Sequence, residues 1–388
     1  MSAKIRSPLS PESAAPSAFR LRPYRLFFPL GVMGGVMGVG AWVLWTAGIK
    51  VPNIGFLHAT LQSQGFLASF VVGFLLTAFP RFAGAPPVAG GGFAFVFASA
   101  LAFYGFALAG RMAFAEAAFI VMLISLLLTL SKSLPYRTKP LPEPFILLGF
   151  ALLHAITGPA LILWSDFGVR SPSAYFIGRQ MVQVGFLSCA VLGVVGKLGP
   201  FLMGYTEDSP DKTVSPNRVW ARIMHAAAGA ALMLTFVTEP SFPRISLSVR
   251  AAVIVAHLSA FGRVFRAIRH RGMAHRIFGL STWFFAAGNV LAALVPVHRI
   301  AALHIVFIGG FSLMIFSFGS VVVLSHGSRG DELTGRMNFL RITGGLVLAG
   351  LLLRVAADFN ANHYMAVSYT HLRAHETKAN LVCRLLLE

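Results

Sequence analysis

The sequence predicts an all-α fold, a polytopic bundle of transmembrane helices. Hydrophobic residues make up 56% of the 388-residue chain and charged residues only 12%, and the mean hydropathy is +0.74. A soluble domain carries about 25% charged residues. Apolar runs follow one another along the chain, and each approaches the roughly 20 residues that a helix needs to cross a bilayer. These two observations, with basic residues gathered between the runs, predict a membrane protein.

The net charge of +19 does not indicate a nucleic-acid partner, because the basic residues lie in loops and form no continuous stripe. Their placement is typical of topology signals in a membrane protein. The two cysteines, Cys189 and Cys383, exclude a disulfide framework and a CxxC metal site.

The elements follow in order along the chain. Residues 1–25 form a basic arm that contains four prolines and is expected to be disordered. Residues 26–367 form the transmembrane domain. Residues 368–388 are polar and of mixed charge, unlike the rest of the chain, and we interpret them as a tail that is not native; a genuine tail is the alternative. The eleven predicted spans are 26–48, 55–80, 88–110, 113–131, 143–164, 174–200, 219–237, 245–268, 275–295, 300–325 and 337–357.

Basic residues alternate between rich and poor loops, which predicts the orientation. The richest loop, residues 263–276, contains five arginines, whereas Lys50 and Arg299 stand in poor segments. Since Lys and Arg accumulate on the cytoplasmic side, the N-terminus and the 263–276 loop are expected to be cytoplasmic.

A weak internal repeat joins three of the spans. The triplet Gly65-Phe66-Leu67 recurs as Gly185-Phe186-Leu187, and Gly310-Phe311 is a fainter copy. These fall in the second, sixth and tenth spans, which run in the same direction. The pattern favours three four-helix units and twelve spans, of which eleven are present. Chance matching of glycine and leucine in apolar sequence is the alternative.

The second span carries a polar stripe. His58, Gln62, Gly65 and Ser69 recur at helical spacing and share one face. Small residues on that face let a helix or a flat cofactor approach closely, and an ionisable residue within a membrane indicates a functional site. The alternative is a packing face whose histidine binds a neighbouring carbonyl group.

Several stretches resemble the NnrS family of membrane proteins. They are YRLFFP at residues 24–29, the stretch 57–84, GKLGPF at residues 196–201, and residues 303–329 from LHIVFIGG to SHGSR. Together they span nearly the whole transmembrane domain. The resemblance implies a place in the bacterial inner membrane, haem and copper as cofactors, and a role in nitric-oxide response, tolerance or metabolism, but no particular reaction.

The chain departs from the family pattern in three places. The family motif similar to W-H-A-H-E is here Leu57-His58-Ala59-Thr60-Leu61, without the second histidine and the glutamate. Lys197 replaces the arginine of G-R-x-x-P-x-F, and residues 325–329 read SHGSR where the family has G-H-T-G-R. One metal site of the family is therefore in doubt here.

Two histidines are predicted to hold haem b. His58 and His304 both lie in the first turns of spans that run from the outer face inward, and facing imidazoles are the usual axial ligands of a haem in a helix bundle. Gly65 and Ser69 on one helix, with Gly309 and Gly310 on the other, would admit the ring. The cations predicted near its propionates are Arg179, Arg250 and Arg299, or these are ordinary interfacial anchors.

A second group of histidines lies inside three other spans. His154, His225 and His257 have roughly similar predicted depths, and neutral imidazole suits copper or a second haem. Hydrogen-bonded packing histidines are the alternative.

Other function classes stay open. A small-solute carrier, or a redox-inert scaffold with the same fold, is the main alternative to a haem protein. An ion-coupled carrier is expected to bury several acidic groups, whereas Glu116 is the one acid well inside a predicted span. The expected partners are the lipid bilayer, haem and nitric oxide or its adducts.

Overall fold

The computed structural model describes residues 22–88, 90–168, 170–205, 218–269, 272–326 and 337–359, and within them it is an all-α bundle without strands. Eleven helices are long and apolar enough to cross a membrane, which confirms the predicted fold class. The single-segment helices are α1 (Tyr24–Thr46), α4 (Gly91–Leu108), α5 (Met112–Ser131), α6 (Phe145–Phe167), α9 (Arg218–Thr238), α10 (Pro243–His257), α11 (Met273–Leu294) and α14 (Asn338–Asp358). The predicted twelfth span and the tail at 368–388 lie outside the described residues.

The remaining three spans are the longest and are each built of two α-helices joined by a π-helical segment. α2 (Ile54–Thr60) continues through Leu61–Leu67 into α3 (Ala68–Ala83). α7 (Pro172–Gln180) continues through Met181–Gly185 into α8 (Phe186–Leu202). α12 (Arg299–His304) continues through Ile305–Ser312 into α13 (Leu313–His326).

These π-helical segments support the predicted repeat. Gly65, Gly185 and Gly310, the residues that defined it, each lie within one of the segments. A π-helical turn is rare and often marks a functional site. The three segments lie at matching positions of the second, sixth and tenth spans, and a fourth π-helical segment, Leu258–Gly262, ends the eighth span outside this pattern.

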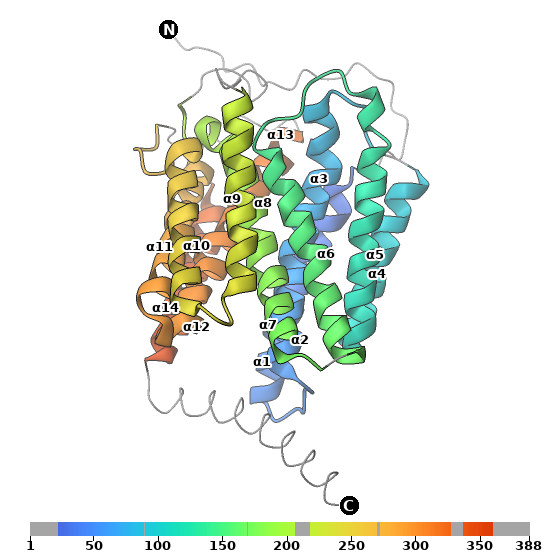
Figure 1. Ribbon diagram of the computed structural model, residues 1–388, viewed down its shortest axis with the longest axis vertical. Coiled ribbons are helices and arrows are strands. Elements are labelled where there is room, and N and C mark those ends of the chain that lie inside the picture. The colour runs from blue at the N-terminus through green and yellow to red at the C-terminus, as the bar shows by residue number, and fades with distance from the viewer. Residues whose placement is uncertain are drawn as a thin grey trace, which may run out of the picture.

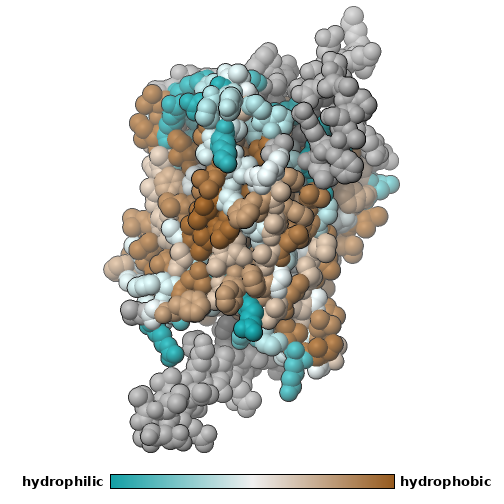
Figure 2. Space-filling model, turned by 90° about the vertical axis from the view of Figure 1, so that its right-hand side faces the viewer, coloured by the Kyte–Doolittle hydropathy of each residue, from teal (hydrophilic) through white to brown (hydrophobic). Residues whose placement is uncertain are grey.

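The surface of the bundle is hydrophobic around its middle and hydrophilic near its two ends. α2, α7 and α12 lie toward one end and α3 and α13 toward the other, so the three long spans run in the same direction (Figure 1). Figure 2 shows a brown, hydrophobic band around the middle of the visible face and teal, hydrophilic residues near both ends. Exposed leucine, valine and phenylalanine side chains on the outer helices form such a band because they face lipid.

One predicted boundary is wrong by six residues. The span expected at 245–268 ends six residues earlier, with a π-helical turn at Leu258–Gly262. Arg263 then adopts a left-handed conformation, with φ of 54°. Residues 263–269 turn back toward the end of α8, where the Arg269 amide donates to the Met203 carbonyl at 3.0 Å.

Candidate functional site

His58 is held against α1 by a backbone contact. Its Nδ1 donates to the Gly38 carbonyl at 2.9 Å, and its ring packs edge-on against Trp42, with centroids 6.1 Å apart. α1 approaches this closely because a side chain at Gly38 would collide with Gln62, one turn beyond His58. Gln62 itself donates to the Gly35 carbonyl at 2.8 Å. His58 and Gln62 therefore fix the contact between the first two spans.

His304 stands in a matching position on the tenth span. It is the last residue of α12, directly before the π-helical segment, and its Nδ1 donates to the Ile300 carbonyl at 2.8 Å. The two rings lie near enough to each other, and to Arg354 of α14, for electrostatic interaction. The structure therefore brings together the two histidines that the sequence pairs, at one end of the bundle.

The hydrogen bonds of both rings leave the same nitrogen available. Because a carbonyl oxygen only accepts, each Nδ1 carries the proton and each Nε2 presents a lone pair. Within the described part of the chain, neither Nε2 has a hydrogen-bond partner. Histidines that bind metal almost always donate their other ring N–H in this way. The donor set fits the axial ligation of a haem iron.

The small residues predicted to admit the ring are covered by aromatic side chains. Ser69 lies 3.4 Å from the hydroxyl of Tyr104, and a Cβ at Gly65 would meet the same hydroxyl at 3.1 Å. A Cβ at Gly309 would meet Phe284, and one at Gly310 would meet Phe285. In this structure these four positions serve helix packing.

Arg179 occupies the corresponding place on the sixth span. It lies two residues before the π-helical segment, with its guanidinium 4.2 Å from the ring centroid of Phe56, two residues from His58. The carboxamide oxygen of Gln183, in the orientation that satisfies both groups, accepts from its Nη2 at 2.8 Å. The buried Nη1 has no hydrogen-bond partner among the described residues. Arg179 therefore retains a donor for an anionic group.

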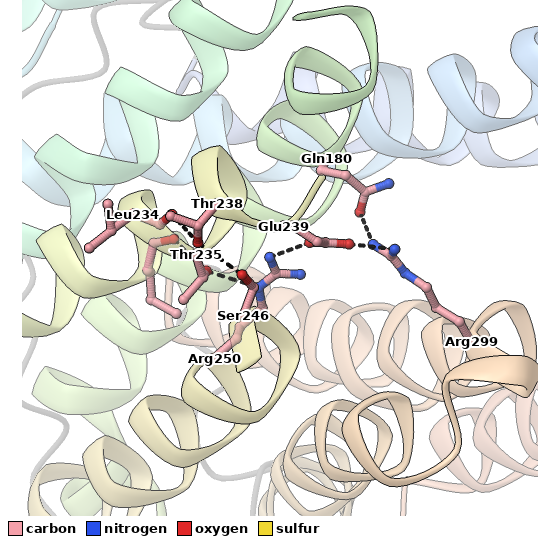
Figure 3. Close-up of polar contacts among 9 residues, drawn as sticks. Gln180, Leu234, Thr235, Thr238, Glu239, Ser246, Arg250 and Arg299 are labelled. Atoms are coloured by element: carbon pink, nitrogen blue, oxygen red, sulfur yellow. Dashed lines mark hydrogen bonds and ion pairs between the residues drawn. The ribbon is translucent and has the colours of Figure 1, made fainter. Parts of the chain in front are cut away.

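Arg250 and Arg299, by contrast, are engaged with one carboxylate (Figure 3). Glu239 is 1% exposed; its Oε2 lies 2.6 Å from Nη2 of Arg250, and its Oε1 forms an ion pair with Arg299. Arg299 also donates to Gln180 at 2.7 Å, and Arg250 stacks 3.8 Å from the centroid of Phe236. Two of the three predicted cations are thus tied into the protein.

Glu239 is a residue that sequence reasoning missed, since it directly follows α9 and was assigned to a loop. Its signal was indirect: an arginine inside a predicted span, such as Arg250, needs a nearby carboxylate. For Glu116, the sequence indicates an acid inside a span but not the residue that hydrogen-bonds to it. The amide of Gln64 donates to it at 2.6 Å, which joins the fourth span to the π-helical segment of the second.

The second histidine group divides into a pair and a single residue. Nδ1 of His225 and Nε2 of His257 share a hydrogen bond at 2.9 Å, and Phe261 packs against both rings. His154 instead donates to the Phe150 carbonyl at 2.7 Å and lies beside Cys189 and Phe236. The predicted three-histidine site is therefore not assembled, and no group of three metal-binding side chains occurs in the described ranges.

Comparison with known proteins gives one match. No curated protein and no solved structure matches the chain. The model of the NnrS protein family matches residues 18–374, nearly the whole chain. This range contains every transmembrane helix described above. The chain therefore belongs to the NnrS family.

Proposed function

We propose that this protein binds haem b between His58 and His304 and acts in nitric-oxide response, tolerance or metabolism. The observation that carries the proposal is that the two imidazole rings have the same tautomer and the same kind of hydrogen bond. They stand near each other at one end of the bundle, each with Nδ1 bonded to a carbonyl and Nε2 available. Family membership supports the same cofactor.

Residues of this chain would orient the haem and neutralise the charge of its propionates. The Gly38 and Ile300 carbonyls fix the tautomer and the ring plane of each histidine. Arg179 offers its unpartnered Nη1 to a propionate, while Arg299 is already paired with Glu239 and is the weaker partner. When bound, haem would supply a redox-active iron, which is the chemistry that nitric-oxide binding requires.

The visible spectrum of the reduced protein tests this assignment. A haem held by two imidazoles gives a low-spin spectrum, so we expect His58→Ala and His304→Ala each to make it high-spin or to lose the haem. His154→Ala, which removes a buried histidine away from the pair, is the matched control and should leave the spectrum unchanged. If both variants at the pair kept the wild-type spectrum, the assignment would be wrong.

The same spectrum separates the haem protein from its alternatives. A small-solute carrier or an inert scaffold has no Soret band in any state. Three acids are buried among the described residues. Glu116 is bonded to Gln64, Glu143 pairs with Arg218, and Glu239 is neutralised by two arginines. These contacts favour a structural role for the three carboxylates over ion coupling.

For copper, we propose the pair His225 and His257. It supplies two imidazoles on facing helices, although their mutual hydrogen bond would have to be replaced by bonds to the metal, and the buried Nδ1 of His257 has no partner among the described residues. Two imidazoles suit copper but do not close a site, so further ligands would have to come from outside this pair. Metal analysis of His225→Ala and His257→Ala, against His154→Ala as the control, should show copper lost from the first two only.

A further inference from the structure

A cluster of arginines at the end of the bundle opposite His58 has no role in the proposed function. Residues 263–269, which we name the 263–269 turn, pack against the last residues of α8. Tyr205 donates to the Ala267 carbonyl at 2.6 Å and the Arg269 amide donates to the Met203 carbonyl at 3.0 Å. The turn is therefore tied to the helix end by two bonds.

These bonds gather three guanidinium groups around one ring. The Cζ atoms of Arg263, Arg266 and Arg269 lie 6.0, 6.0 and 4.7 Å from the ring centroid of Tyr205. All three arginines are exposed, and no carboxylate pairs with them within the described part of the chain. Like charges held this close repel one another, and an anion placed among them would relieve the repulsion.

The other face of the turn is apolar and lies against α11. Phe265 packs against Trp283, with ring centroids 4.8 Å apart, and a Cβ at Gly279 would meet Ile268. Gly279 is six residues into α11, or about 9 Å from its start by helical rise. Trp283 is 52% exposed and Leu280 is 39% exposed, so an apolar surface borders the charged one.

We propose that the 263–269 turn binds the headgroup of an anionic phospholipid, whose acyl chains lie along Trp283 and Leu280. Guanidinium groups form paired hydrogen bonds with phosphate oxygens. Basic sites between transmembrane helices recognise anionic lipid headgroups in the same way. The adjoining apolar surface favours a lipid over a free phosphate, which would use only the arginines.

Trp283 gives a local probe for this lipid. The full chain would be placed in phosphatidylcholine bilayers that contain a minor fraction of brominated phosphatidylglycerol or, in parallel, brominated phosphatidylcholine. The contribution of Trp283 is the difference in quenching between the wild type and Trp283→Phe. We expect the brominated anionic lipid to quench Trp283 more strongly than the brominated neutral lipid does.

The arginine variants decide what causes that preference. Replacing all three arginines with glutamine should abolish it, with relative association falling about fivefold per arginine, as expected for a basic residue near an anionic surface. Replacing them with lysine keeps the charge and should retain most of it. The matched control removes three exposed cations from other helix ends at the same face, in Lys132→Gln, Arg137→Gln and Arg222→Gln, and should leave the preference intact.

Three results would overturn the proposal. The first is equal quenching by both lipids in the wild type, and the second is a preference that survives the glutamine replacements. The third is arginine-dependent binding of inorganic phosphate without stronger quenching of Trp283 by the brominated anionic lipid, which would show that the arginines take a free anion.

Discussion

At the scale of single residues, Glu239 has the largest expected effect on stability. It is almost fully buried and neutralises both Arg250 and Arg299. Glu239→Gln would leave the buried Arg250 and the partly exposed Arg299 without a carboxylate, and breaking a buried pair costs about 3 to 5 kcal/mol. We expect a clear drop in the thermal unfolding midpoint of the purified protein.

Arg218→Gln is the control for that measurement. The ion pair of Arg218 with Glu143 is longer, at 3.5 Å, and the arginine side chain is 37% exposed. Pairs of this kind contribute at most about 1 kcal/mol. If Glu239→Gln and Arg218→Gln lowered the thermal unfolding midpoint equally, the importance assigned to Glu239 would be contradicted.

Tyr104 tests whether the small residues of the second span serve packing. Its hydroxyl donates to the Leu30 carbonyl at 3.1 Å and lies beside Ser69. Tyr104→Phe should lower stability by about 1 kcal/mol, the usual contribution of one hydrogen bond, and leave haem content unchanged. Loss of haem in this variant would instead show that Gly65 and Ser69 border the cofactor.

At the scale of elements, the fifth and sixth spans contact each other backbone to backbone. A Cβ at Gly158 would lie 2.7 Å from the Gly178 carbonyl oxygen and 2.9 Å from the Val182 amide nitrogen. Gly158→Ala therefore forces two backbones apart, and overpacking of this kind costs about 1 to 3 kcal/mol.

Gly149→Ala provides a control on the same helix. A Cβ at Gly149 would meet nothing within 4 Å, so alanine should be neutral or stabilise the helix by up to about 1 kcal/mol. Relative to the wild type, the thermal unfolding midpoint should fall for Gly158→Ala, and it should rise or stay unchanged for Gly149→Ala. A similar gain in both would mean that helix propensity, and not contact, dominates.

The helices themselves were largely predictable, because apolar length is a strong signal inside a membrane. Most predicted boundaries lie within three residues of the observed ones. The π-helical segments were not predictable, since no residue type demands them; only the recurrence around Gly65, Gly185 and Gly310 hinted at a shared feature.

The candidate site was predictable in part for the same physical reason. Depth along a helix follows from residue number, so the position of both His58 and His304 near one face could be inferred from the sequence. The direction of a side chain around the helix axis depends on which helices are neighbours. For that reason the sequence grouped His154 with His225 and His257, whereas the structure turns it toward Phe236.

At the scale of the whole molecule, orientation remains a prediction. Arg137 and the 263–269 turn lie near the same end of the bundle, opposite His58. Reporter fusions at residues 138 and 272 should therefore report the same side, and the basic residues there predict the cytoplasm. Opposite signals from the two fusions would contradict the arrangement of helices, and a shared periplasmic signal would reverse the orientation.

The three long spans have a consequence for access. They contain 30, 31 and 30 residues, which at helical rise is about 45 Å, whereas the hydrocarbon core is about 30 Å thick. Each span therefore extends beyond the core. His58 is the fifth residue of its span and His304 the ninth, so both rings lie at or just beneath the headgroup boundary. A soluble electron carrier or a dissolved gas molecule would reach a haem held there without crossing the bilayer.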